Sequence, residues 1–181
     1  MLRDLDELVN QQLAKMLFAN PQRIDYYDRY QEIIDAYNAE QNRATIEKTF
    51  MDLMELASSL DTEQQRYVRE GFSSDEELSV YDLLFSENLT KQEIETIKKV
   101  SVDLLTKIKQ QIAKLDHWTD KQETKAIVDN LIRNTLWQEL PNSYDVSDIQ
   151  TYQKKIYEYV YMRYPEVASV SYTHLTLPTI A

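Results

Sequence analysis

Apolar residues in the chain recur at the spacing of an α-helix. Steps of three and four residues return to one face of a helix, which has about 3.6 residues per turn. Within residues 42–60, one such series consists of Ile46, Phe50, Leu53, Ala57 and Leu60. Within residues 90–115, the series consists of Ile94, Ile97, Leu104, Ile108, Ile112 and Leu115, and Ser101 interrupts the same face. Each series predicts an amphipathic helix with one buried side.

The C-terminal part of the chain continues this pattern. After Thr119 the expected stripe consists of Ile127, Leu131 and the pair Leu136/Trp137. The last stripe consists of Ile149, Tyr152, Ile156, Tyr159 and Val160, with Tyr157, Tyr161 and Tyr164 nearby. No repeat period is evident, so the pattern does not favour a solenoid.

Capping signals mark where these helices begin and end. Asn20 precedes Pro21, an N-cap followed by a proline at the first helical position. Four pairs have the capping-box spacing: Ser73/Glu76, Thr90/Glu93, Thr119/Gln122 and Ser147/Gln150. Gly71 follows a helical stretch, where a helix end favours a left-handed residue. These signals predict an all-α fold, an irregular multi-helix bundle of about eight helices.

Composition supports the helical prediction and limits the domain count. The chain has 181 residues, with one glycine and four prolines, too few for the turns of a sandwich, barrel or Rossmann-type sheet. One helical domain over residues 1–166 is expected. The segment 167–181 contains no Asp, Glu, Lys or Arg, lacks helical periodicity, and looks like translated adapter or vector sequence. We expect it to be an unstructured or non-native tail.

Charge and residue usage exclude several function classes. A net charge of −11 argues against autonomous binding to nucleic-acid phosphates. Absence of cysteine removes thiolate catalysis and disulfides, and one glycine is too few for a phosphate-binding loop. No apolar run reaches the length of a membrane span, and the N-terminal sequence is too acidic for a signal peptide. The expectation is a soluble, cytoplasmic protein.

Few residues are available for catalysis or metal binding. The two histidines, His117 and His174, are far apart, and no H-E-x-x-H or E-x-x-H pattern is present. Glu123-Thr124-Lys125 has the form of the E-x-K triplet of metal-dependent nucleases, but it lies inside an expected helix without a preceding strand. It is interpreted as helix-surface charge. We therefore expect no catalytic, cofactor-binding or metal-binding residue in the chain.

One stretch, DHWTDKQETK (116–125), has two interpretations. In the first, His117 is a general base and Trp118 a stacking platform, in a stand-alone helical enzyme or nucleic-acid-binding domain that also uses nearby acids. In the second, the stretch is a corner between two helices, with Trp118 packed beneath a cap at Thr119. The second interpretation is favoured, because neighbouring charges suit a solvated helix surface.

Six stretches in a fixed order resemble one known family. They are NPQRIDYYDRYQEIIDAYN (20–38), RATIEKTFMDLMEL (43–56), QQRYVREGFSSDEELSVYDLL (64–84), LTKQEIETIKKVSVDLLTKIK (89–109), DHWTDKQETKAIVDNLIRNTLW (116–137) and LPNSYD (140–145). The series resembles the C-terminal helical region of the restriction, or motor, subunit of type I restriction-modification enzymes. The resemblance covers nearly everything from the start to about Tyr164.

The resemblance implies an accessory role without chemistry of its own. The whole subunit of that family carries a nuclease domain and an ATP-driven DNA translocase, and it uses ATP and Mg²⁺. The motifs of those parts are absent here, so a non-catalytic assembly module is implied. Its expected partners are the methyltransferase (modification) and specificity subunits and the motor/nuclease part of its own parent chain, with DNA contacted only indirectly. The expected interaction surface consists of Trp118, Trp137, Tyr157 and Tyr161.

Overall fold

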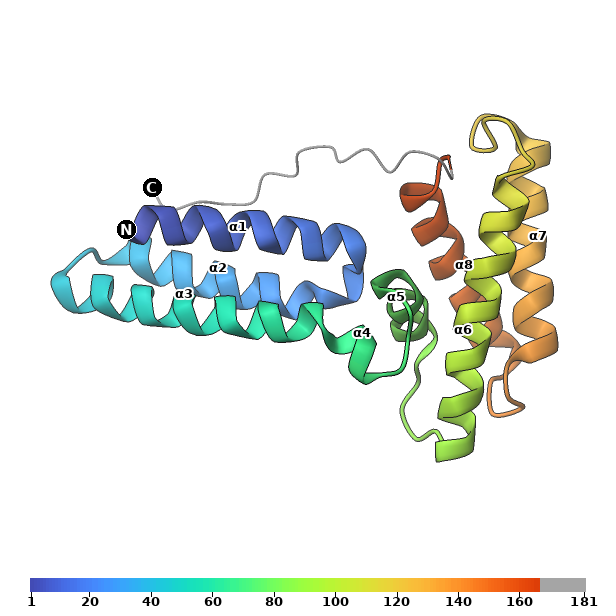
Figure 1. Ribbon diagram of the computed structural model, residues 1–181, viewed down its shortest axis with the longest axis horizontal. Coiled ribbons are helices and arrows are strands. Elements are labelled where there is room, and N and C mark those ends of the chain that lie inside the picture. The colour runs from blue at the N-terminus through green and yellow to red at the C-terminus, as the bar shows by residue number, and fades with distance from the viewer. Residues whose placement is uncertain (167–181) are drawn as a thin grey trace. The chain divides into compact units, whose positions relative to one another are not determined.

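The computed structural model describes residues 1–166, which contain eight α-helices, one 3₁₀ helix and no strand (Figure 1). The all-α prediction is confirmed. The elements are α1 (Leu2–Ala19), η1 (Pro21–Arg23), α2 (Ile24–Ala39), α3 (Arg43–Gln64), α4 (Arg66–Arg69), α5 (Asp75–Leu84), α6 (Lys91–Ile112), α7 (Gln122–Glu139) and α8 (Val146–Arg163). Across these residues no helix is both long and apolar enough to cross a membrane. The tail expected at 167–181 lies outside the described residues.

These helices form two compact units, where the sequence suggested one helical domain over residues 1–166. The first unit is Met1–Glu76, and the second begins at Glu77 and includes the remaining described residues. The division falls near the start of α5. Each unit has its own buried hydrophobic side chains and is described separately.

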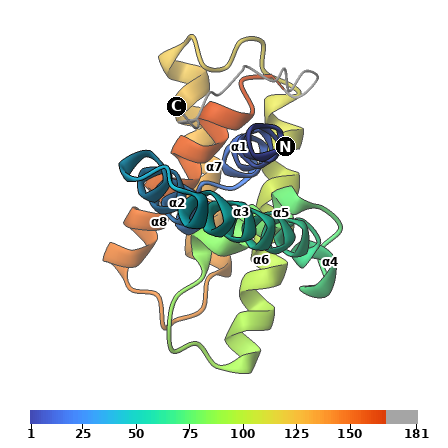
Figure 2. The ribbon, with the colours of Figure 1, turned by 90° about the vertical axis from the view of Figure 1, so that its left-hand side faces the viewer.

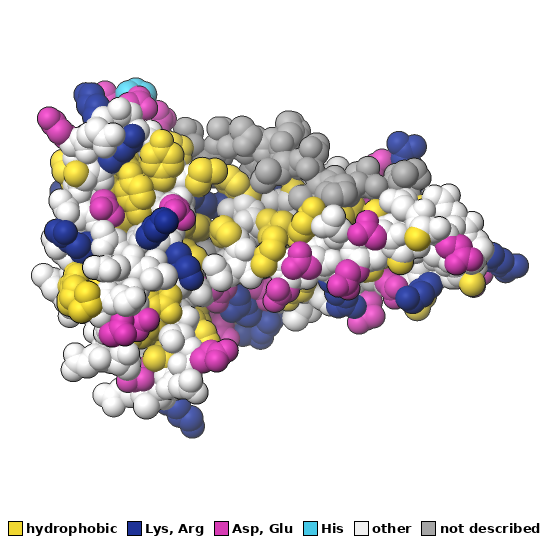
Figure 3. Space-filling model, turned by 180° about the vertical axis from the view of Figure 1, so that it is seen from behind, with side chains coloured by type: hydrophobic (Ala, Val, Ile, Leu, Met, Phe, Trp, Pro, Cys, Tyr) yellow, Lys and Arg dark blue, Asp and Glu magenta, His cyan; other side chains and the backbone are white. Residues whose placement is uncertain are grey.

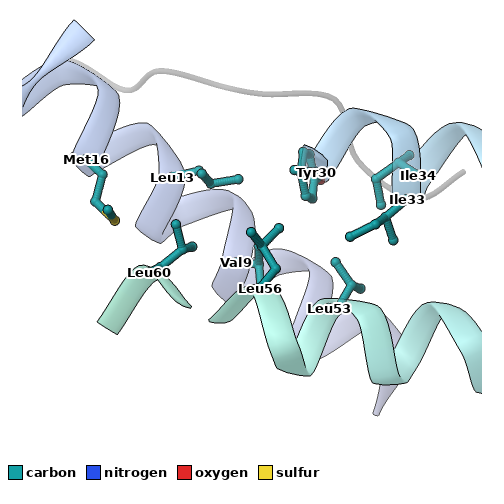
Figure 4. Packing of buried hydrophobic residues seen from close by; sticks show 9 residues of the cluster. All are labelled: Val9, Leu13, Met16, Tyr30, Ile33, Ile34, Leu53, Leu56 and Leu60. Carbon is teal, nitrogen blue, oxygen red and sulfur yellow. The ribbon is translucent and has the colours of Figure 1, made fainter. Parts of the chain in front are cut away.

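The first unit is a bundle of α1, α2 and α3, which Figure 2 shows nearly end-on. Its core contains side chains from all three helices (Figure 4): Val9, Leu13, Met16, Tyr30, Ile33, Ile34, Leu53, Leu56 and Leu60. Burying a side chain of this size contributes about 1.5–3 kcal/mol. Packing of the three amphipathic helices therefore provides the stability that isolated helices largely lack in water.

The buried face of α3 differs from the expected stripe. Leu53 and Leu60 are buried as predicted, but Ile46 is exposed, and Phe50 and Ala57 are only half-buried. The face toward the core instead carries Thr49, Leu53, Leu56, Leu60 and Glu63. Thr49 and Glu63 are polar, so a prediction based on hydrophobicity alone left them out. It placed the buried face too far around the helix, toward Ile46.

A buried arginine organises one end of this unit. The side chain of Arg23 is only 3% exposed, and its Nε lies 3.1 Å from Oε1 of Glu63. Its Nη1 and Nη2 donate to the two carboxylate oxygens of Asp75, at 2.9 and 2.6 Å. Arg66 also donates to Glu63 through Nε. A bidentate pair of this geometry compensates the loss of hydration that burial of the guanidinium entails.

A second polar contact links α1 to α2 inside the bundle. The hydroxyl of Tyr30 donates to Oδ1 of the buried Asp6 at 2.8 Å, and Nδ2 of Asn10 donates to the same hydroxyl oxygen at 3.2 Å. Burial raises the pKa of Tyr30 well above its ordinary value. Tyr30 therefore remains a neutral hydrogen-bond donor inside the core.

In the second unit, α7 packs against both α6 and α8 (Figure 1). The predicted stripe of α6 is confirmed at Ile97, Leu104, Ile108 and Ile112, which are buried, while Ile94 and Leu115 are half-buried. Ser101 lies in the buried face, where its hydroxyl donates to the carbonyl of Ile97 at 2.7 Å. This local bond satisfies the hydroxyl and explains how a serine interrupts the stripe without a buried unpaired donor.

The buried face of α8 agrees with the predicted stripe, but that of α7 does not. Ile149, Ile156, Tyr159 and Val160 of α8 are buried as expected. On α7 the buried residues are Val128, Ile132, Thr135 and Leu136, whereas Ile127 and Trp137 are exposed and Leu131 is half-buried. The true face of α7 lies one residue further along the chain than the predicted one. Adjacent apolar pairs, Ile127/Val128 and Leu131/Ile132, made both faces plausible from sequence.

Two of the predicted helix starts are confirmed. The carbonyl oxygen of the Asn20 side chain accepts from the N–H of Gln22, although Pro21 begins the short η1 before α2. Thr90 and Glu93 form the expected capping box at α6. The start of α5 lies at Asp75, so the residue immediately before it is Ser74, not Ser73.

Two other expected capping boxes are wrong. α8 is capped by Asp145 and Asp148, whose side chains each accept from the other's backbone N–H, and Ser147 already lies inside the helix. α7 begins at Gln122 after Lys121, which provides no side-chain cap. A backbone bond from Asp120 to the carbonyl of His117 makes a separate turn that contains Thr119. The helix therefore starts later than the Thr119/Gln122 pair implied.

Gly71 occupies the left-handed position expected at a helix end. Its φ is 84°, and it follows α4 and the C-cap Glu70. The N–H of Phe72 bonds to the carbonyl of Tyr67 at 2.9 Å, and that of Gly71 to Val68 at 3.1 Å. These two bonds form a Schellman motif, which satisfies the last carbonyls of the short helix.

Candidate interaction surface

The stretch between α6 and α7 forms a corner, as the favoured interpretation predicted. His117 adopts φ 46°, a left-handed conformation that is uncommon outside glycine and reverses the chain direction. Its side chain is 61% exposed, with Nε2 3.5 Å from Oδ1 of Asp116 and Nδ1 3.5 Å from Oε1 of Glu166. Within residues 1–166 no group of three or more His, Asp or Glu side chains is arranged to hold a metal ion. The exposed imidazole is best explained as part of the turn.

Trp118 is the centre of this corner. Its side chain is 0% exposed, and its Nε1 donates to the backbone carbonyl of Tyr164 at 2.7 Å. The ring meets Tyr157 and Tyr161 edge-on, with centroid distances of 6.1 and 5.8 Å. The carbonyl of Trp118 accepts from Oγ1 of Thr124 at 2.6 Å. Thus one residue connects the loop before α7 with both α7 and the end of α8.

The four residues expected to form an interaction surface have different environments. Trp118 is fully buried, so in this structure it lies behind the surface and supports its other residues. Tyr157 is half-buried and Tyr161 is 39% exposed, and both pack on Trp118. Trp137 is 50% exposed but lies in the last turn of α7, about 20 Å along the helix from its first residue. The structure therefore groups three of the four aromatics and separates Trp137.

The exposed part of this cluster is apolar with a cation beside it. Nζ of Lys125 lies 5.9 Å from the centre of the Tyr161 ring, within the range of a cation–π contact. Burial raises the pKa of Tyr157, and the nearby Asp129 adds to the effect. Tyr161 and the neighbouring Met162 are exposed at the end of α8. Figure 3 shows hydrophobic side chains exposed on the second unit.

A groove between α7 and α8 adjoins the aromatic cluster. Its volume is about 520 Å³, and its lining side chains come from two facing rows: Gln122, Lys125, Ala126 and Asp129 on α7, and Gln150, Gln153, Lys154 and Tyr157 on α8. Each row has the spacing i, i+3, i+4, i+7, which places its members on one helix face. The groove was not evident from the sequence, because its lining is polar and resembles an ordinary solvated helix surface. The feature of the sequence that could have revealed the groove was the matching spacing of these two rows of residues.

Comparison with known protein families matches residues 1–164 to the family described as "Type I restriction enzyme HindI endonuclease subunit-like, C-terminal". The match covers almost all the described residues, both compact units and the corner at Trp118. The chain belongs to this family. The resemblance inferred from the six sequence stretches is thereby confirmed. Comparison with curated proteins and with solved structures gives no match.

Proposed function

We propose that the chain is a non-catalytic helical assembly module of a type I restriction-modification enzyme. It docks the ATP-dependent translocase/endonuclease subunit onto the methyltransferase core, in the cytoplasm. ATP and Mg²⁺ are bound by the motor and nuclease parts of the parent subunit, and the specificity subunit selects the DNA site. The family membership of residues 1–164 supports the restriction-system part of this proposal.

The observation that carries the docking part is the supported aromatic surface at the end of α8. Tyr161 is partly exposed, while its inner side packs on the fully buried Trp118. A rigid, half-exposed tyrosine with an adjacent lysine is the kind of residue that dominates binding energy at protein interfaces. Because the supporting indole is itself fixed by the Tyr164 carbonyl, little side-chain entropy is lost when a partner binds.

The docking proposal is tested by co-expressing the tagged chain with the modification and specificity subunits of the same restriction system. We expect the three to co-purify and to elute together in size-exclusion chromatography. Tyr161→Ala should weaken the association about tenfold or more, since truncating a central interface tyrosine commonly has that effect. Tyr37→Ala, which changes a half-buried tyrosine of the first unit, is the matched control. No co-elution of the unsubstituted chain would contradict the proposal.

Direct DNA binding is a distinct outcome that can be measured separately. With a net charge of −11 the chain has no excess of cations to release phosphate counterions. We expect no change in the fluorescence anisotropy of a labelled duplex oligonucleotide at low salt. A salt-sensitive increase would instead favour a nucleic-acid-binding domain.

A further inference from the structure

We propose that the groove between α7 and α8 binds an extended acidic segment of a partner protein. The inference rests on the proposed docking function for the identity of the partner, which would be a subunit of the methyltransferase core. The chemistry of the segment follows from the side chains that line the groove.

The geometry of the groove suits a short extended peptide. Gln122 and Asp129 mark the ends of the row on α7, and Gln150 and Tyr157 those of the row on α8. Seven residues of α-helix rise about 10 Å, which equals about three residues of extended chain. The two rows face each other along this length, because α7 and α8 are joined by a short loop and run antiparallel (Figure 1). A helix, with a diameter of about 10 Å, needs a wider and more apolar groove.

The charges of the groove favour an acidic ligand. In the described chain neither Lys125 nor Lys154 has a carboxylate within ion-pair distance, whereas Lys107 contacts two and Lys48 contacts one. The only acid in the lining is Asp129, whose Oδ1 accepts from Nε2 of Gln153 at 3.0 Å. Two lysines without a carboxylate partner therefore line a groove whose single acid already accepts a hydrogen bond.

The overall acidity of the chain does not prevent such binding. Charges further than about 8 Å are largely screened at physiological ionic strength, so acids far from the groove have little effect on a ligand bound there. The same acidity does oppose a nucleic-acid strand, which carries a charge at every residue and would extend beyond the two lysines. A peptide carries its acids only where the lysines lie, so it is the better match.

The remaining lining groups specify more of the ligand. Side-chain amides of Gln122 and Gln150 offer both a donor and an acceptor, which match the N–H and C=O of a peptide backbone. Tyr157 provides an apolar wall, because its ring packs on Trp118 on the other side. The expected segment therefore carries an apolar residue next to an acidic one.

The test is an NMR titration of the ¹⁵N-labelled full chain with the blocked tripeptide acetyl-Asp-Leu-Glu-amide. We expect shifts at the side-chain amides of Gln122, Gln150 and Gln153 and at the backbone of Lys125 and Lys154. Acetyl-Asn-Leu-Gln-amide, which has the same shape without charge, and acetyl-Lys-Leu-Lys-amide should bind at least tenfold more weakly. Equal shifts with all three peptides, or none with the acidic one, would overturn the inference.

Charge-reversal variants locate the binding site. Lys125→Glu/Lys154→Glu should reduce binding of the acidic peptide about tenfold or more. Lys99→Glu/Lys114→Glu, a matched change at exposed lysines of α6 and the segment after it, should leave it unchanged. If circular dichroism shows that the groove variant is misfolded, Lys125→Gln/Lys154→Gln provides the same comparison without repulsion. Similar losses in both pairs, or stronger groove shifts with a single-stranded oligonucleotide, would count against an acidic peptide site.

The two proposals fail in different ways. If the chain co-purifies with the modification subunit and the groove variant does so equally well, docking stands and the groove inference is wrong. If the groove binds the acidic peptide but the chain does not co-purify with that subunit, the groove inference stands and the docking function is wrong.

Discussion

The indole Nε1 of Trp118 donates a hydrogen bond to the backbone carbonyl of Tyr164, 2.7 Å away and 46 residues further along the chain. This bond holds the end of α8 against the corner that precedes α7. It also fixes the ring on which Tyr157 and Tyr161 pack. The most buried aromatic of the second unit thus determines the position of its partly exposed ones.

We expect Trp118→Phe to lower the free energy of unfolding by about 1–3 kcal/mol, because the buried Tyr164 carbonyl loses its donor. Trp118→Ala should cost about 3–5 kcal/mol through the cavity it leaves. Urea unfolding followed by circular dichroism measures both. The control is Trp137→Phe, at an exposed position, which should change stability by less than about 0.5 kcal/mol. A Trp118→Phe variant as stable as that control would show that the hydrogen bond is dispensable.

Arg23→Met should destabilise the first unit by about 3–5 kcal/mol, since it removes the buried cation that Glu63 and Asp75 share. Arg23→Lys should recover only part of the loss, because an ammonium cannot make the two parallel bonds to Asp75. Thermal unfolding provides the measurement. For comparison, Arg29→Met breaks the exposed pair with Glu55 and should cost less than about 1 kcal/mol. Equal effects at Arg23 and Arg29 would contradict this account.

Glu139→Gln should make the second unit less sensitive to rising pH. Nζ of Lys107 lies 2.8 Å from Asp103 and 3.4 Å from Glu139, so two acids share one cation. Burial, followed by the hydrogen bond with Asp103, raises the pKa of Glu139 above its ordinary 4.5. The hydrogen bond with Glu139, followed by that with Lys107, lowers the pKa of Asp103 below 3.8.

The two shifts have opposite consequences for stability. The contribution of protonated Glu139 is complete below its ordinary pKa and is lost as pH rises through the raised one. That of ionised Asp103 is present above its ordinary pKa and is lost as pH falls through the lowered one. The unsubstituted chain should therefore lose stability relative to Glu139→Gln as pH rises from the ordinary pKa of Glu139, 4.5, through its raised one. Urea midpoints at several pH values measure this difference, and a difference that does not change with pH would contradict the prediction.

Asp145→Ala should destabilise α8 by about 1 kcal/mol, because the side chain of Asp145 accepts from the N–H of Asp148 at 2.8 Å. Ser147→Ala should have an effect within about 0.5 kcal/mol, since this residue lies inside the helix. Comparing the midpoints of thermal unfolding for the two variants is sufficient. If Ser147→Ala were the more harmful, the cap would lie where the sequence pattern first suggested.

The fold was predictable because amphipathic spacing and the scarcity of glycine both indicate helices. Which face of each helix is buried was harder to predict. On α7, adjacent apolar residues such as Ile127 and Val128 allowed two faces, and only packing selects one of them. On α3, the polar Thr49 and Glu63 lie in the core face, and Glu63 does so because Arg23 reaches it through space. Pairings of that kind depend on residues 40 positions apart, which periodicity does not reveal.

The candidate site was only partly predictable for the same reason. The sequence identified Tyr157 and Tyr161 but not that Trp118 lies wholly behind them. The groove depends on two polar rows that become neighbours only when α7 and α8 pack together. Its lysines looked like ordinary surface charge until the absence of a nearby carboxylate in the described chain distinguished Lys125 and Lys154 from Lys107.

The backbone at Gly71 has the left-handed conformation that a D-residue prefers. A Cβ placed there meets no atom within 4 Å, so the obstacle to a side chain is the positive φ and not lack of space. L-alanine would be strained at this φ, but D-alanine is the mirror-image residue that prefers it. A semisynthetic chain with D-alanine at position 71 would retain the Schellman turn while its unfolded state has fewer conformations, and so would be more stable. The only glycine is thus a site where a residue of opposite handedness to the rest of the chain strengthens the fold.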